Sequence, residues 1–113
     1  MADLTQLYDE ADQLKEEGKF DEAIAKLNEL LQEAPDYVLA HMALAVLLGK
    51  QNQHDEAIKH AVQACEIESD QAFNFTALSV TYQRAFAGTQ NQDYMRLAED
   101  AMSKARALQF SQQ

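Results

Sequence analysis

Apolar residues recur along this chain at the spacing of amphipathic helices. Leu27, Leu30 and Leu31 fall on one face of a helix, because residues three and four apart lie on the same side. Gly18 and Pro35 interrupt the pattern, since glycine tolerates the left-handed conformation that ends many helices and proline cannot continue one. The pattern predicts six helices, over about 4–17, 20–33, 36–50, 54–67, 70–87 and 92–108.

Two polar side chains stand where helices are predicted to begin. Asp3 precedes the first helix and Ser69 precedes the fifth. A carboxylate or hydroxyl oxygen at such a position accepts a hydrogen bond from a backbone N–H of the first turn. We therefore expect both residues to be N-caps.

A four-residue motif repeats at a fixed distance. Asp21-Glu22-Ala23-Ile24 recurs as Asp55-Glu56-Ala57-Ile58, which is 34 residues later. A period of this length is typical of solenoids, in which each unit buries its apolar face only by stacking on the next. Aligning Ala98 with Ala57 gives an offset of 41, which is seven more than 34. The predicted units are about 4–37, 38–71 and 72–112, with a seven-residue insertion near 85–91.

Composition favours an all-α chain with one domain. Of the 113 residues 47% are hydrophobic, and three Gly and one Pro leave little material for turns. Cys65 is the only cysteine, so no internal disulfide is expected. The N-terminus lacks the basic start and apolar stretch of a secretory signal, and no apolar run approaches the roughly 20 residues that span a bilayer. We therefore expect a cytoplasmic location.

The net charge of −10 narrows the classes of partner. Nucleic acid and anionic membrane surfaces attract basic patches, so neither is an expected partner. The charge is also uneven. Residues 1–37 hold eleven acids and three bases, 38–71 hold five and two, and 72–113 hold three and four. The acidic surface is therefore concentrated in the first unit.

Bulky, small and aromatic residues follow the same order in each unit. The first unit has Leu7, Ala11, Leu14, Gly18, Phe20, Ala23, Leu27 and Pro35; the second has His41, Leu44, Ala45, Leu48, Ala57, Ala61, Ala64 and Ile67; the third has Phe75, Leu78, Ser79, Tyr82, Ala98, Met102, Ala105 and Leu108. This order resembles the tetratricopeptide repeat family over nearly the whole chain. The resemblance implies a right-handed solenoid of three helical hairpins. The small residues in this order also have a physical reason, because helix axes approach to about 8 Å only where side chains are short.

The resemblance places a binding surface on the concave face, lined by the first helix of each hairpin. The residues that it places there are Tyr8, Asp9, Asp12, Leu39, Met42, Ala43, Val46, Phe73, Ala77, Val80 and Arg84. They form an apolar floor with an acidic edge at one end. A contiguous exposed apolar patch usually marks a binding surface. Three interpretations are open: the apolar residues belong to the core, they receive an apolar or amphipathic segment of a partner, or a second copy of the chain covers them.

The best-known ligand of the family is a C-terminal carboxylate held by a clamp of Lys, Asn and Arg side chains. Those positions are occupied here by Tyr8, Asp12, Ala43, Phe73 and Ala77. None of these side chains supplies the donors that the clamp requires, and Asp12 would repel a carboxylate. We therefore expect a partner with apolar side chains, and with basic ones for the acidic edge.

Catalytic chemistry finds little support in the sequence. Cys65 and His41 fall at packing positions, and no cationic neighbour is evident to activate the thiol. Glu56 and His60 are four apart on one helical face, where two ligands can meet a metal but where a surface pair is far commoner. The sequence favours a non-enzymatic adaptor without cofactor or metal. A self-associating scaffold is the alternative, and a metal-dependent or thiol enzyme is a weak third.

Overall fold

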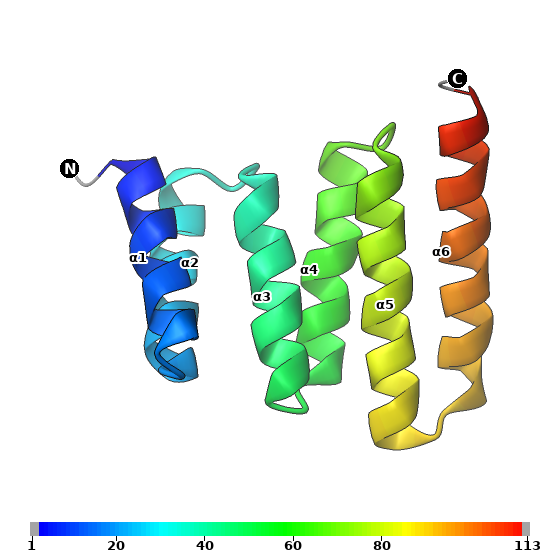
Figure 1. The fold of residues 1–113 in the computed structure, drawn as a ribbon, viewed down its shortest axis with the longest axis horizontal. Coiled ribbons are helices and arrows are strands. Elements are labelled where there is room, and N and C mark those ends of the chain that lie inside the picture. The colour runs from blue at the N-terminus through cyan, green and yellow to red at the C-terminus, as the bar shows by residue number, and fades with distance from the viewer. Residues whose placement is uncertain (1–2, 112–113) are drawn as a thin grey trace.

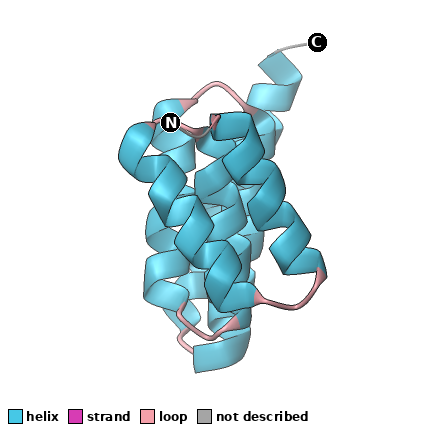
Figure 2. Cartoon of the chain, turned by 90° about the vertical axis from the view of Figure 1, so that its left-hand side faces the viewer, coloured by secondary structure: helices cyan, strands magenta, loops and turns pink. Residues whose placement is uncertain are grey.

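The computed structural model describes residues 3–111, so the four terminal residues of the predicted domain lie outside the described residues. Within that range the chain is helical and contains no strand (Figure 1; Figure 2). The helices are α1 (Leu4–Glu16), α2 (Phe20–Glu33), α3 (Val38–Lys50), α4 (His54–Ile67), α5 (Ala72–Thr89) and α6 (Gln92–Ser111). None of them is long and apolar enough to cross a membrane.

The helices form three hairpins in a row. The hairpins are α1 with α2, α3 with α4, and α5 with α6. The second helix of each hairpin packs on the first helix of the next, so that α2 contacts α3 and α4 contacts α5. In Figure 1 the row runs from α1 at the left to α6 at the right. The all-α helical repeat predicted from the sequence is therefore confirmed.

Local chemistry accounts for several helix ends. The carboxylate of Asp3 accepts a hydrogen bond from the N–H of Thr5 at 3.0 Å, which confirms the predicted N-cap. Gly18 follows α1 with a φ of 78°, and Asn52 holds the same left-handed conformation 34 residues later with a φ of 62°. Glycine and asparagine tolerate this conformation better than other residues do. The turn after α5 uses Gln90, also at a φ of 62°.

Several helix boundaries differ from the predicted ones by one to three residues. Ser69 is not an N-cap, because α5 begins at Ala72 after Gln71. Residues 68–71 are occupied by a turn, in which the side-chain amide of Asn74 donates to the carbonyls of Ala64 and Glu68 at the end of α4. The third helix begins two residues later than predicted, at Val38, and α6 continues to residue 111. α5 has 18 residues against 13 in α3.

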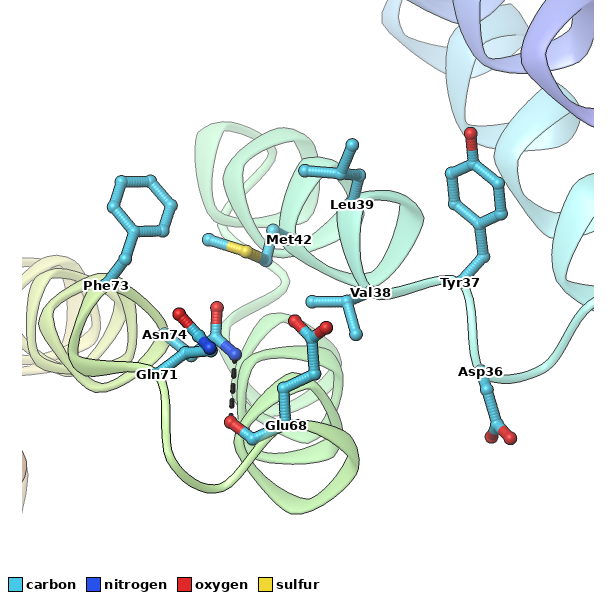
Figure 3. A pocket seen from close by; sticks show the side chains of 9 residues that line it. All are labelled: Asp36, Tyr37, Val38, Leu39, Met42, Glu68, Gln71, Phe73 and Asn74. Atoms are coloured by element: carbon cyan, nitrogen blue, oxygen red, sulfur yellow. Dashed lines mark hydrogen bonds between the residues drawn. The ribbon is translucent and has the colours of Figure 1, made fainter.

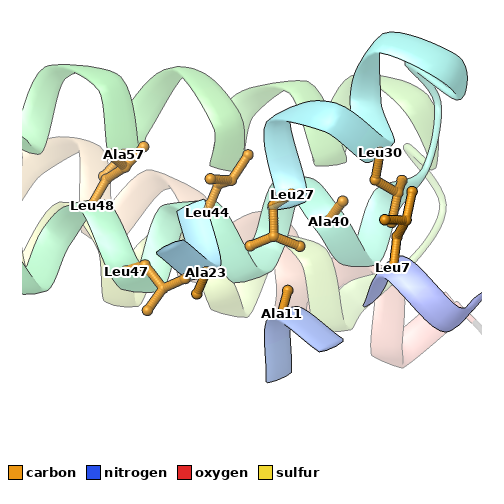
Figure 4. Close-up of a cluster of buried hydrophobic side chains, with 10 residues drawn as sticks. All are labelled: Leu7, Ala11, Ala23, Leu27, Leu30, Ala40, Leu44, Leu47, Leu48 and Ala57. Carbon is orange, nitrogen blue, oxygen red and sulfur yellow. The ribbon is translucent and has the colours of Figure 1, made fainter. Parts of the chain in front are cut away.

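Small residues lie where the hairpins cross. Ala23 and Ala57 are fully buried in a cluster that also contains Leu27, Leu30 and Leu44 (Figure 4). The other small residues at predicted crossings are buried too: Ala11, Ala45, Ser79 and Ala98. The hydroxyl of Ser79 donates to the carbonyl of Ala98 at 2.8 Å, which joins α5 to α6. Short side chains therefore set the close approach of the helices.

A pair formed by the buried His41 and the half-buried His60 joins the turn after α2 to α3 and α4. Nε2 of His41 lies 2.7 Å from the carbonyl oxygen of Pro35, so this nitrogen carries a hydrogen and donates it. Nδ1 of a neutral His41 is then an acceptor, and Nδ1 of His60 donates to it at 3.0 Å. The structure confirms that His41 is a buried packing residue with its hydrogen bonds satisfied.

We predict that Ala57→Leu destabilises the fold. Ala57 has no exposed surface, so the added carbons would force α3 and α4 apart, at a typical cost of about 1–3 kcal/mol. Urea unfolding followed by helical circular dichroism measures this free energy. Ala25→Leu is the matched control, because Ala25 on α2 is exposed. Equal stability of the two variants would contradict close packing at this crossing.

We also predict that stability falls when His60 becomes protonated. Burial lowers the pKa of His60 below its ordinary value of 6.5, and the neighbouring His41 adds to this effect while Glu56 opposes it. The folded chain then binds fewer protons than the unfolded chain, so the free energy of unfolding decreases as the pH falls below 6.5 toward the folded pKa. Urea unfolding at a series of pH values should show a weaker decrease for His60→Gln. Identical pH profiles for the two proteins would refute the assignment.

Candidate functional site

A hollow opens between α3 and α5, the first helices of the second and third hairpins. It has a volume of about 270 Å³. Its walls include six residues predicted from the sequence: Met42, Val46, Phe73, Ala77, Val80 and Arg84. Ala61 and Ala64 of α4 line it as well. These two side chains are short, so the space between α3 and α5 extends down to the helix behind them.

A second hollow adjoins the first at the N-terminal ends of α3 and α5. It has a volume of about 390 Å³ and is lined by Asp36, Tyr37, Val38, Leu39, Met42, Glu68, Gln71, Phe73 and Asn74. Met42 and Phe73 line both hollows, so the two form one continuous depression. In Figure 3 Met42 lies between Leu39 and Phe73 at its mouth. We call this depression the α3–α5 groove.

The apolar side chains of the groove are accessible. Phe73 is 68% exposed, Leu39 is 52% exposed and Val80 is 36% exposed. Met42 and Val46 are half-buried. The interpretation that Leu39, Phe73 and Val80 belong to the core is therefore wrong.

Two threonines line the groove without making it polar. The hydroxyl of Thr81 donates to the carbonyl of Ala77 at 2.9 Å, and that of Thr76 donates to the carbonyl of Ala72 at 3.2 Å. Both donors are used within α5, so the groove gains no free hydroxyl hydrogen from them. Thr81, like the alanines of α4, was not among the residues predicted to line the site. The spacing of apolar residues in α3 and α5 does not reveal that α4, the second helix of its hairpin, forms part of the wall.

Arg84 supplies a positive charge at the C-terminal end of α5. A Cβ built on Gly49 of α3 would lie 3.7 Å from Cδ of Arg84, so the arginine stem packs over this glycine. Within residues 3–111 the guanidinium makes no ion pair. The groove therefore has a cationic group at one end that is free to meet a carboxylate.

The residues predicted on α1 lie apart from this groove. Tyr8, Asp12 and Ala43 line a separate hollow between α1 and α3 of only about 10 Å³, the space of a single water molecule. Asp12 pairs with Lys15 at 3.1 Å, and the ring of Tyr8 packs against that of Tyr37 in a tilted arrangement with centroids 6.0 Å apart. Burial, followed by the charge of Asp12, raises the pKa of Tyr8. Asp9 is exposed on α1, so the acidic edge lies beside the groove and not within it.

The candidate reactive groups are occupied or inert. Burial raises the pKa of the Cys65 thiol to about 11, which keeps it protonated at neutral pH. Glu56 pairs with Lys59, and His60 donates to His41. Nε2 of His54 is buried without a hydrogen-bond partner beneath Gly88, where even a methyl group would collide with it. No group of three metal-ligating side chains is found among the residues described.

Comparison with known proteins gives a consistent result. A family model described as tetratricopeptide repeat matches residues 14–64. A solved structure described as the second TPR of Spaghetti (RPAP3) bound to the HSP90 peptide SRMEEVD matches with a TM-score of 0.75 and 19% sequence identity, and the match covers 93% of this chain and 91% of that chain. No curated protein matches the chain. The family model therefore shows a tetratricopeptide repeat within residues 14–64, and the structural match, together with the three hairpins described above, shows the fold of such a domain over most of the chain.

Proposed function

We propose that the chain is a non-enzymatic adaptor that binds an apolar or amphipathic peptide or helix of another protein in the α3–α5 groove. The observation that carries this proposal is Phe73, an aromatic side chain with 68% of its surface exposed at the mouth of an apolar hollow. Such a side chain is costly to leave in water unless a partner covers it. We also propose that the protein is located in the cytoplasm.

The groove suits a partner with one or two large apolar anchors. Burying a Phe or Leu side chain stabilises a complex by about 1.5–3 kcal/mol relative to leaving it exposed. Phe73 and Leu39 are both available for such burial, and Met42 between them is a flexible side chain that adapts to different shapes. A few buried anchors of this kind supply most of the affinity at protein interfaces.

Charge would then select among partners with similar anchors. Asp9 and Asp12 on α1 favour basic residues where the partner passes the first hairpin. Arg84 favours an acidic residue at the opposite side of the groove. Exposed charges of this kind affect the association rate and the choice of partner more than the affinity.

The RPAP3 domain supports a peptide as the ligand class, and the ligand itself is proposed to differ. That domain was solved with an HSP90 peptide. In this chain the clamp positions predicted from the family hold no suitable donor: Asp12 is an exposed acid, and Phe73 and Ala77 are apolar. At 19% identity the likeness shows the fold alone. We therefore propose recognition by apolar anchors in place of a gripped terminal carboxylate.

We predict that a double variant, Met42→Glu with Phe73→Glu, abolishes binding and keeps the fold. Two carboxylates at the mouth would have to lose their hydration when an apolar anchor enters, which is strongly unfavourable. The protein would be used as bait in cell lysate, and the captured partner would then be titrated by calorimetry. Helical circular dichroism checks that the variant is folded.

Asn28→Glu with Gln63→Glu is the matched control. Both residues are exposed and line a hollow on the other side of the solenoid, beside His41 and His60. This control adds the same two charges, and it should bind as the wild type does. Equal affinity of all three proteins would refute the groove as the binding site. Loss of helicity in the first variant would instead show that Met42 or Phe73 supports the core.

A further inference from the structure

Within residues 3–111 no further helix covers the outer face of α6. Between α5 and α6 lies a hollow of about 660 Å³, lined by Ser79, Gln83, Phe86, Met95, Ala98, Glu99, Met102, Ser103 and Arg106. Met95 is 37% exposed, and Phe110, near the C-terminal end of α6, is 79% exposed. In Figure 1 no described helix follows α6 in the row, although each earlier hairpin is covered by the helix that follows it. The hollow is separate from the α3–α5 groove.

The first hairpin of another copy is a poor occupant for this hollow. Ala40, Leu44 and Leu47 bury α3 in the core that it shares with the first hairpin. The residues 34 positions earlier on α1 are Gln6, Glu10 and Gln13. These polar side chains bond to other residues of the first hairpin: Gln6 to Glu10, Glu10 to Lys26 and Gln13 to Glu17. α1 therefore presents a hydrated face, and head-to-tail stacking of copies would leave the apolar part of the hollow facing polar groups.

The outer face of α6 is instead complementary to itself. Met95, Glu99, Met102, Ser103, Arg106 and Phe110 fall within about 100° of the helix circumference, so they form one stripe. Met95 and Phe110 are equally distant from the midpoint between Met102 and Ser103, and so are Glu99 and Arg106. A two-fold axis through that midpoint would bring each member of a pair against the other member in a second, antiparallel copy. We call this set the α6 stripe.

The charges of the α6 stripe are available for such a contact. Neither Glu99 nor Arg106 forms an ion pair with another residue in the range 3–111. Arg96 and Asp100, which lie to the side of the stripe, pair with each other at 3.7 Å. Glu99 and Arg106 are therefore both available for the ion pairs that the two-fold arrangement would form.

We propose that two copies of this chain associate through antiparallel α6 helices, with Met95 of each copy against Phe110 of the other. Glu99 and Arg106 form two symmetric ion pairs across the contact, and Met102 lies beside the two-fold axis. The second α6 occupies the hollow that a following helix of the solenoid would occupy. The α3–α5 groove takes no part in this contact, so both copies keep it open for a peptide.

Charge reversal tests the arrangement in the full chain. Glu99→Arg places two cations together at each symmetric site, and Arg106→Glu places two anions together. Each variant alone should dissociate, with the dimer dissociation constant raised by roughly tenfold or more. An equimolar mixture of the two variants should form a heterodimer, because every contact then joins opposite charges again. Sedimentation equilibrium and light scattering over a concentration series measure these masses.

Arg96→Glu is the control, since it changes the same charge on α6 outside the stripe and should leave the dimer intact. Circular dichroism verifies that each variant is folded. Wild-type protein that stays monomeric at every concentration would overturn the proposal. Single variants that dimerise as tightly as the wild type, or a mixture of them that fails to associate, would overturn it as well. Neither result would bear on peptide binding, which the Met42 and Phe73 variant tests separately.

Discussion

Alanine-sized side chains where helices cross are the constraint on which this structure depends. Ala23 and Ala57 leave room for neighbouring helices to approach closely, and the leucines of the same cluster bury their side chains there. Short side chains also shape the α3–α5 groove. Because Ala61 and Ala64 of α4 are short, the space between α3 and α5 reaches down to α4 and forms a hollow instead of a flat seam.

α3 and α5 therefore have two apolar sides with different roles. Leu44 and Leu78 face inward and belong to the core, whereas Val46 and Val80 face the α3–α5 groove. A helix of an ordinary globular protein places polar residues opposite its buried stripe. α3 and α5 depart from this pattern, because each has a second apolar side that lines the α3–α5 groove. The first hairpin has no such groove. α1 is polar on its outer side, and Tyr8, Asp12 and Lys15 close the space between α1 and α3.

The sequence predicted the fold well because repeats carry redundant information. The identical motifs at Asp21 and Asp55, the glycine at Gly18 and the small crossing residues all indicate the same hairpin. It predicted less of the turns, since Ser69 has the composition of an N-cap and the decisive hydrogen bonds come from Asn74, a residue inside the next helix. The groove was predicted in its central residues. The α3–α5 groove is separate from the hollow beside α1, where Tyr8 packs against Tyr37, and the periodicity of the sequence does not encode this packing.

The central claim is that the α3–α5 groove is the surface through which this protein meets its partner. Methyl resonances in a two-dimensional NMR spectrum test it most directly, recorded with and without the captured partner. We expect the methyl signals of Leu39, Met42, Val46 and Val80 to shift on binding, while that of Leu31, on the opposite side, stays in place. Shifts confined to Leu31 and its neighbours, with the groove methyls unchanged, would contradict it.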